Sequence, residues 1–248
     1  CGLANESRIK NIKPILKLID EIPIISTDFL SFLKKLANYY YCSTGEMIET
    51  AIPKSLREGR PIDLRVQDSC FGLKKTQNTA YKFDAYVYPV EDDIKKIEFF
   101  TKNIAETLVN KKQVILLLPD TSLTEIWQSR LQERFKTARI AIYNSRLKKS
   151  QALSTWLEIK SGRVDIVVGS RLSIFSPLDN LGLIIVDGED NFAYKQETRP
   201  YYNARDVAIM LAQNIKARLI LSSISPSLET FKKTEKNEFR LIKNENGL

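Results

Sequence analysis

From residue 83 onward, short apolar runs alternate with longer stretches that carry apolar residues at helical spacing, and this limits the fold more than any other feature. Apolar runs bounded by polar residues are typical of strands that are buried on both faces of a sheet. They occupy 83–90, 113–119, 139–144, 164–170, 181–187 and 218–224. The helical patterns between them cover 92–110, 122–136, 148–161 and 203–214. This order predicts an α/β fold with a parallel sheet, helices on both faces, and functional residues beyond the carboxyl ends of the strands.

The preceding part of the chain has a different texture and shows helical spacing over 8–59. Thr27 or Asp28 can cap a helix through the sequence FLSFLKKLANYYY. Gly45 starts a second helix, which Pro53 ends. The sequence therefore predicts a small, mainly helical block, a linker and the α/β domain, at 1–60, 61–82 and 83–248.

The chain is basic, with 38 Lys and Arg against 30 Asp and Glu, a net charge of +8 and a pI near 9.2. Such a balance favours a polyanionic partner, either nucleic acid or an anionic membrane surface. There is no histidine, and the three cysteines lack metal-ligand spacing, so we expect no zinc site and no imidazole chemistry. Free thiols suit a reducing cytoplasm, and no segment has the apolar length of a membrane span.

The first candidate site lies in the stretch YVYPVEDDIKKIEFF, where a strand, a short loop and a helix follow one another. A phosphate-binding loop at this place would need glycines that let backbone N–H groups approach the phosphates. Glu91, Asp92 and Asp93 occupy the loop instead, and each would repel a triphosphate by about 1–4 kcal/mol at about 4 Å. Lys95 and Lys96 do not restore the cradle. We expect these acids to cap the helix, and no nucleotide to bind in the usual mode.

The second candidate site is the end of the apolar run in LGLIIVDGEDN, residues 181–191. Asp187, Glu189 and Asp190 could hold Mg²⁺ and a nucleotide, since an Asp beside a Glu at a strand end suits a magnesium–water–phosphate site. Gly188 interrupts the acids, however, and a polar turn at the edge of the sheet explains the same pattern.

The third candidate site is the stretch NFAYKQETRPYYNARD, in which aromatic residues alternate with cations. Aromatic rings can stack on bases while cations hold phosphates, although a partly buried loop with aromatic anchors would look the same. Arg171, in GSRLSIFSP, also follows a strand. The candidate DNA-binding residues are Arg171, Tyr194, Lys195, Tyr201, Tyr202 and Arg205.

Taken together, these stretches resemble the PriA replication-restart DNA helicase family. The block IKPILKLIDEIPIIS to LREGRP resembles the second half of the family's 3′ DNA-binding domain. QVILLLPDTSLT, VDIVVGSRLSIFSPLDNLGLIIVD, AYKQETRPYYNARDVA and SSISPSLE resemble motifs of its first RecA-like motor lobe. The resemblance implies a RecA-like lobe of the P-loop NTPase type after a helical remnant of the DNA-binding domain. For an intact family member it implies ATP, Mg²⁺ and 3′–5′ helicase activity.

The same resemblance shows where this chain departs from the family. The family's phosphate loop, G-x-T-G-S-G-K-T, is EDDIKK here, and its D-E-E-H is Asp187, Gly188, Glu189 and Asp190. No counterpart is found for the first half of the 3′ DNA-binding domain, the second motor lobe or its zinc-binding cysteines, and the winged-helix domain is reduced to about the linker. A helicase needs two lobes that close on ATP. We therefore expect degenerate Walker motifs and no bound ATP, Mg²⁺ or other metal.

Three hypotheses follow for the function. The leading one is a PriA-like protein in the nucleoid that binds single-stranded or branched DNA without ATPase or helicase activity. Its protein partners would be primosome or single-strand-binding proteins, and it would not bind membranes. The second is a RecA-like scaffold or protein-interaction module with no DNA role. The third is a fragment of an active helicase whose phosphate loop lies elsewhere in the parent chain.

Overall fold

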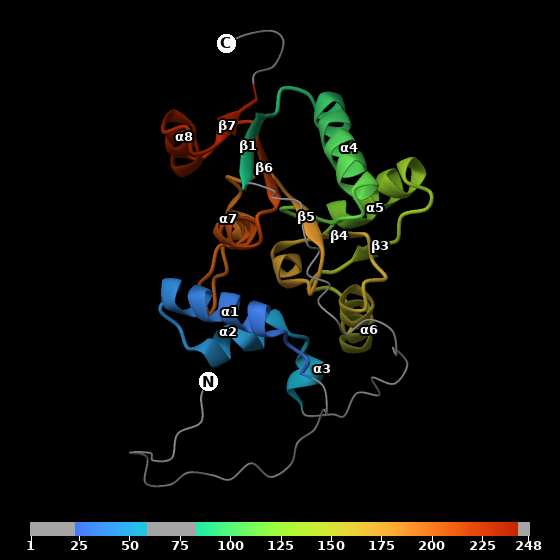
Figure 1. Ribbon diagram of the computed structural model, residues 1–248, viewed down its shortest axis with the longest axis vertical. Helices are drawn as coiled ribbons and strands as arrows, with labels where there is room; N and C mark the ends of the chain where they lie inside the picture. The colour runs from blue at the N-terminus through green and yellow to red at the C-terminus, as the bar shows by residue number, and fades with distance from the viewer. Residues whose placement is uncertain (1–22, 59–82, 243–248) are drawn as a thin grey trace.

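The computed structural model describes residues 23–58 and 83–242, and these contain a seven-stranded, fully parallel sheet (Figure 1). The strand order is β3-β4-β2-β5-β6-β1-β7. The strands are β1 Asp84–Pro89, β2 Gln113–Leu117, β3 Ile140–Ile142, β4 Ile166–Gly169, β5 Leu181–Asp187, β6 Arg218–Ser223 and β7 Arg240–Leu241. The six predicted strands and the α/β fold class are confirmed. Strand β7 has two exposed residues, too few to leave an apolar run in the sequence.

Helices follow the strands in the alternation that the sequence predicts. The helices of the α/β domain are α4 Asp93–Val109, α5 Leu123–Arg134, α6 Lys149–Lys160, α7 Ala204–Ile215 and α8 Leu228–Glu235, with short 3-10 helices η2 Arg171–Phe175 and η3 Phe192–Tyr194. The four predicted helices are confirmed as α4 to α7. The helix α8 begins after the Ser-Pro-Ser stretch, and the Ser227 side chain caps it.

The sheet divides the core into two layers, because successive strand residues point to opposite faces. In β2, Val114 and Leu116 face one layer with α4 and α5, whereas Ile115 and Leu117 face the other. The second layer is covered by α6, α7 and the N-terminal helices α1 Thr27–Tyr39 and α2 Thr44–Ala51. The N-terminal helices therefore share a core with the α/β domain (Figure 1).

The N-cap residues of the N-terminal helices are serines and not the residues predicted. The hydroxyl of Ser26 accepts a hydrogen bond from the backbone of Phe29, so Ser26 and neither Thr27 nor Asp28 caps α1. Ser43 and Glu46 form a capping box at the start of α2, one residue before the predicted Gly45. A short third helix, α3, covers Lys54–Arg57. The rest of the predicted helical block, residues 1–22, and the predicted linker 61–82 lie outside the described residues.

Three consecutive tyrosines at the end of α1 have different surroundings. Tyr40 packs against the shared core, and its hydroxyl lies 3.2 Å from the carbonyl oxygen of Asn203 and 3.3 Å from the same residue's nitrogen. Tyr39 and Tyr41 are exposed, by 56% and 97%. Tyr40 thus joins the N-terminal helices to the start of α7. None of the described helices is long and apolar enough to cross a membrane.

Candidate functional site

The candidate residues gather at one edge of the sheet, because β1, β5 and β6 are parallel neighbours and end side by side. Three connections leave this edge: the loop from β1 to α4, the segment from β5 to α7 and the loop from β6 to α8. The sequence predicted a site beyond the carboxyl ends of the strands, and all of its candidate residues except Arg171 lie in these connections, at the end of β5 or in the first turns of α4 and α7.

In the loop from β1 to α4, the acids occupy the start of the helix as the sequence predicted. The carboxylate of Asp92 accepts a hydrogen bond of 2.9 Å from the backbone of Ile94, and Asp92 is the N-cap of α4. Glu91, Asp93 and Lys95 are exposed. A negative charge therefore already occupies the positive end of the helix dipole.

Lys96 behaves differently from its neighbour Lys95. Its Nζ lies 3.0 Å from Asp93 and 3.3 Å from Asp187 at the end of β5, and its side chain is 16% exposed. Burial lowers the pKa of Lys96, but the charge of Asp187 and hydrogen bonds to both carboxylates raise it above its usual value. Lys96 therefore stays charged and links the start of α4 to the end of β5, the two regions predicted as degenerate Walker motifs.

Asp187 is buried, and both of its carboxylate oxygens have partners. Lys96 contacts Oδ2, and the Ser222 hydroxyl donates a hydrogen bond of 2.8 Å to Oδ1. The next residue, Gly188, has a left-handed φ of +65°, which favours glycine, and it offers no side chain at this position. The candidate magnesium site therefore presents an aspartate that already has a cation beside it.

Glu189 turns away from Asp187 and into the protein, where it is 1% exposed. Its carboxylate accepts hydrogen bonds from the Ser227 backbone at 2.6 Å, the Ser227 hydroxyl at 3.0 Å and the Thr230 hydroxyl at 3.0 Å. Arg205 completes the set with an ion pair of 3.2 Å. Glu189 thus connects the start of α8 to the start of α7, and these contacts give it a structural role.

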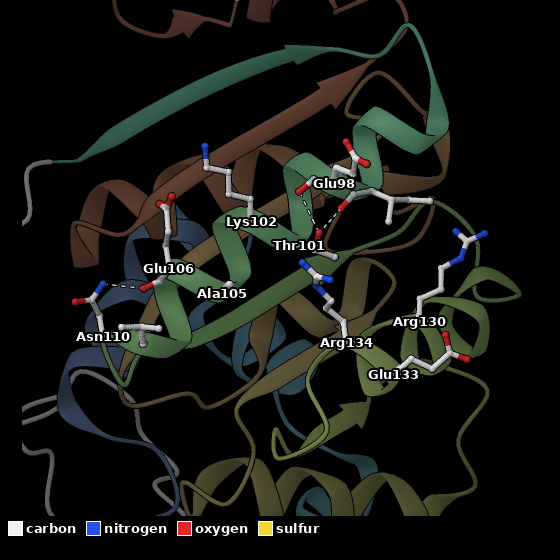
Figure 2. Close-up of a pocket in the computed structure, with 11 residues that line it drawn as sticks. Glu98, Thr101, Lys102, Ala105, Glu106, Asn110, Arg130, Glu133 and Arg134 are labelled. Atoms are coloured by element: carbon white, nitrogen blue, oxygen red, sulfur yellow. Dashed lines mark hydrogen bonds between the residues drawn. The ribbon is translucent and has the colours of Figure 1, made fainter.

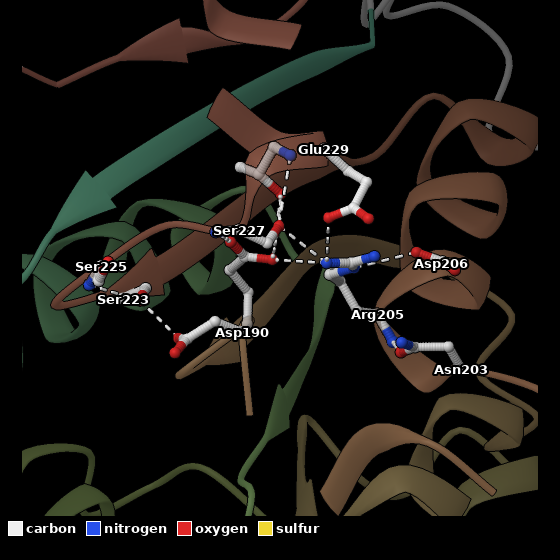
Figure 3. Close-up of polar contacts among 10 residues, drawn as sticks. Asp190, Asn203, Arg205, Asp206, Ser223, Ser225, Ser227 and Glu229 are labelled. Atoms are coloured by element: carbon white, nitrogen blue, oxygen red, sulfur yellow. Dashed lines mark hydrogen bonds and ion pairs between the residues drawn. The ribbon is translucent and has the colours of Figure 1, made fainter. Parts of the chain in front are cut away.

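Arg205 is held in the same network, so its predicted contact with DNA needs correction (Figure 3). Its guanidinium also contacts Asp206 at 3.0 Å and the Ser227 hydroxyl at 2.8 Å, and its side chain is 11% exposed. Burial lowers the pKa of Arg205, but Asp206 and Glu189 more than offset this effect, so it remains a cation. A buried, fully paired guanidinium is not available to a phosphate.

Asp190 forms a smaller pair beside this network (Figure 3). The Ser223 hydroxyl donates to its carboxylate at 2.5 Å and accepts from the Ser225 backbone at 2.9 Å. Among the described residues, no group of three or more Asp, Glu or Cys side chains is arranged to hold a metal ion. The acids that follow β5 therefore bind parts of the protein itself.

The third candidate stretch contains two buried tyrosines, and the prediction that their rings face DNA is not met. Tyr194 is 1% exposed, and its hydroxyl lies 2.7 Å and 3.0 Å from the carbonyl oxygens of Asp187 and Leu117. Tyr202 is 2% exposed and meets Phe175 edge to face at 5.2 Å. Burial raises the pKa of both phenols. These rings anchor the loop, which is the alternative that the sequence left open.

Arg171 also holds this loop in place through hydrogen bonds to its backbone. Its Nη1 donates hydrogen bonds to the carbonyl oxygens of Ala193 and Lys195, at 3.2 Å and 3.0 Å. The guanidinium is therefore engaged with the backbone, although the residue is half-buried and not fully covered.

The remaining candidates, Lys195 and Tyr201, do point outward. Tyr201 is 60% exposed, and Lys195 lies on the surface with its ammonium 5.7 Å from the centre of the Phe192 ring. Phe192 is itself 66% exposed, and the Arg199 side chain is 76% exposed. Lys195 and Asn203 form an isolated antiparallel bridge, which closes a hairpin-like loop; we use the name hairpin for residues 192–203. The sequence analysis did not identify Phe192 and Arg199, and no periodic pattern in this stretch marks them as exposed.

A separate, wide hollow of about 1210 Å³ lies between α4 and α5 (Figure 2). Acidic and basic side chains alternate along it, including Glu98, Lys102, Arg130 and Glu133. It contains none of the candidate residues, and its mixed charge favours neither anions nor cations.

Comparison with known proteins agrees with this architecture. A model of the DEAD/DEAH box helicase family matches residues 84–233, and a model described as the 3′DNA-binding domain (3′BD) matches residues 1–53. The replication restart protein PriA of Rickettsia typhi is 32% identical over 250 residues, which cover 97% of this chain and 38% of that protein. PriA of Bacillus subtilis is 35% identical over 147 residues, or 59% of this chain and 18% of that protein.

The chain thus spans less than two fifths of the length of these relatives. Among solved structures, the DUF1998 helicase MrfA aligns at 12% identity with a TM-score of 0.49, covering 91% of this chain and 34% of that one. The helicase family model covers well over half of the chain, and PriA proteins align along almost all of it. The chain therefore belongs to the DEAD/DEAH box helicase family, and it is related in sequence to the replication restart protein PriA.

Proposed function

We propose that this chain is a PriA-like protein of replication restart that binds single-stranded or branched DNA and does not hydrolyse ATP. One observation carries the proposal. The hairpin exposes aromatic and basic side chains, and residues at the predicted nucleotide site form a buried network that holds this hairpin in place. Residues at the positions that would bind ATP hold the loop in place, and the loop's outward side chains are exposed, although Arg199 lies 3.9 Å from Glu46.

Three features support the absence of ATP chemistry. The acids Glu91 to Asp93 stand where phosphates would approach, and like charges there disfavour a triphosphate. Lys96 is paired with Asp187, which also accepts from Ser222. Gly188 stands where the related family carries an acid, so the position has no carboxylate to align a water molecule. The side chains present do not fit a magnesium–nucleotide complex as they are arranged.

The exposed side chains of the hairpin support DNA as the partner. Phe192 and Tyr201 offer rings to bases, while Lys195 and Arg199 offer charges to phosphates. The net charge of +8 also favours binding to the phosphates of DNA. Primosome proteins or single-strand-binding proteins in the nucleoid are the protein partners that such a role would bring.

Binding to a DNA fork at two salt concentrations, with and without Mg-ATP, tests both halves of the proposal. We expect affinity to fall steeply with salt, by about one logarithmic unit of slope for each phosphate contact on duplex DNA and somewhat less on single strands. We expect millimolar Mg-ATP to change neither the affinity nor the melting temperature. Ligand linkage would add about 2.7 kcal/mol at a hundred times Kd, so a clear thermal shift would contradict the loss of nucleotide binding.

A scaffold without a DNA role is the second candidate, and the burial of Tyr194, Tyr202 and Arg205 favours it. A folded Lys195→Ala variant and a folded Tyr201→Ala variant that both bind DNA like the parent would place the scaffold ahead.

A further inference from the structure

The turn that ends α1 has the hydrogen bonds of a Schellman motif, with Tyr41 at the position that usually holds glycine. The backbone N–H of Tyr41 donates to the carbonyl oxygen of Asn38 at 3.4 Å. The next N–H, that of Cys42, donates to Ala37 at 3.0 Å. Tyr41 has a left-handed φ of +51°, a conformation that favours glycine because a side chain is disfavoured there. An aromatic residue therefore stands where the backbone favours glycine.

Packing does not explain Tyr41 either. It is 97% exposed, the highest value among the exposed large hydrophobic side chains of the described residues. The other described non-glycine residues with a positive φ are Lys111, Lys216 and Asn237, whose polar side chains suit a solvated turn. Neither backbone preference nor burial thus accounts for the tyrosine, and a residue kept in a disfavoured conformation without packing indicates a role in binding.

The turn that carries Tyr41 lies beside the hairpin. On one side of it in the chain, the Tyr40 hydroxyl contacts the backbone of Asn203. On the other side, Oε1 of Glu46 lies 3.9 Å from Nη1 of Arg199. Tyr41 stands between these two points of contact in the sequence. It therefore extends the exposed aromatic and basic surface of the hairpin onto the N-terminal helices.

The chemistry of this surface favours a base of single-stranded nucleic acid. Every base has a π-face that can stack on an aromatic ring, so stacking on Tyr41 requires no particular sequence. The Arg199 side chain, 76% exposed, offers a charge to a neighbouring phosphate. A docked protein would instead require a contiguous apolar patch, whereas Ser43 and Glu46, which follow Tyr41 in the turn, are polar.

We propose that Tyr41 is a second stacking position for single-stranded DNA, so that one strand runs from Tyr201 on the hairpin to Tyr41 at the end of α1. This inference rests on the proposed function and adds a contact to it. A strand bound in this way touches both the α/β domain and the N-terminal helices. DNA binding therefore reinforces the joint that Tyr40 and Asn203 make between them.

Tyr41→Gly separates binding from folding, because its two expected effects have opposite signs. Glycine relieves the left-handed backbone, so the melting temperature should rise by about 2–4 °C. Affinity for single-stranded DNA should fall about tenfold, because one stacking contact is lost. Tyr41→Phe keeps the ring and should bind like the parent. Asn237→Gly is the matched control, since it places glycine at the same left-handed position after α8, and it should leave DNA affinity unchanged.

Photo-crosslinking with an oligonucleotide that carries iodouracil in place of thymine identifies the stacked side chains directly. We expect adducts on both Tyr41 and Tyr201 in peptide mass spectra. Adducts on the hairpin alone, or an unchanged DNA affinity in Tyr41→Gly, would overturn this inference and leave the proposed function intact. A protein partner would then be the explanation for the exposed ring. A parent protein that neither binds DNA nor forms adducts would contradict the proposed function itself.

Discussion

The segment from Glu189 to Arg205 has an inward set and an outward set of side chains, which differ in their exposure and in their contacts with the rest of the protein. We define the inward set as Glu189, Tyr194, Tyr202 and Arg205, and the outward set as Phe192, Lys195, Arg199 and Tyr201. Members of the inward set are nearly inaccessible and tied to the sheet and to α8. Members of the outward set are exposed. The proposal therefore assigns stability and binding to different residues of a single segment, and mutations can separate them.

The largest expected effect comes from removing the inward cation. Arg205→Ala leaves the Glu189 carboxylate buried without its ion pair, and breaking a buried pair in this way costs about 3–5 kcal/mol of unfolding free energy. Chemical denaturation would measure the loss. Arg139→Ala is the control, because its pair with Asp165 is more exposed and should be worth less than about 1 kcal/mol. Equal losses in the two variants would contradict the division.

The outward counterpart is Tyr201→Ala. If the ring stacks on a base, affinity for single-stranded DNA should fall by about 1–3 kcal/mol, whereas the melting temperature should stay close to that of the parent. Tyr201→Phe keeps the ring and should retain the affinity. Fluorescence anisotropy with a short labelled oligonucleotide would show both effects, and a variant that melts early but binds normally would place Tyr201 in the inward set.

Tyr194→Phe isolates one hydroxyl of the inward set. The buried carbonyl oxygens of Asp187 and Leu117 would lose their contact with the phenol, and we expect a loss of stability of about 1–2 kcal/mol. DNA affinity measured well below the melting temperature should not change. A selective loss of DNA affinity with normal stability would show that this tyrosine reaches the nucleic acid after all.

The smallest expected effect is that of Lys195→Ala. An exposed lysine contributes less than about 0.5 kcal/mol to folding, so the melting temperature should be unchanged. One lost phosphate contact should lower the slope of log affinity against log salt by about one. The weakening should be similar for oligonucleotides of different sequence. A slope identical to that of the parent would remove Lys195 from the binding surface.

The apolar runs were sufficient to predict six of the seven strands, because a buried parallel strand is apolar along most of its length. They were not sufficient to sort the tyrosines of the hairpin. Tyr201 and Tyr202 are adjacent and of the same type, and which one is buried depends on the bridge between Lys195 and Asn203. A contact between two short segments leaves no periodic pattern in the sequence.

The candidate acids were located correctly at the edge of the sheet, but their partners could not be predicted. Glu189 meets Ser227 and Thr230, which are 38 and 41 residues away, and Lys96 meets Asp187 across 91 residues. Pairing over such separations depends on strand order, since β1 lies next to β6 and not next to β2. A charge pattern in the sequence shows that buried acids need ion-pair or hydrogen-bond partners, but it does not identify which residues these are.

The hydrogen bond between Tyr40 and Asn203 joins residues that are synthesised at different times, since they are 163 positions apart. At about 5–20 residues per second, Tyr40 is synthesised roughly 8–33 s before Asn203. Throughout that interval the apolar side of α1, with Phe32, Leu33 and Leu36, has no α7 to cover it. The N-terminal helices therefore cannot complete their core before α7 has been synthesised.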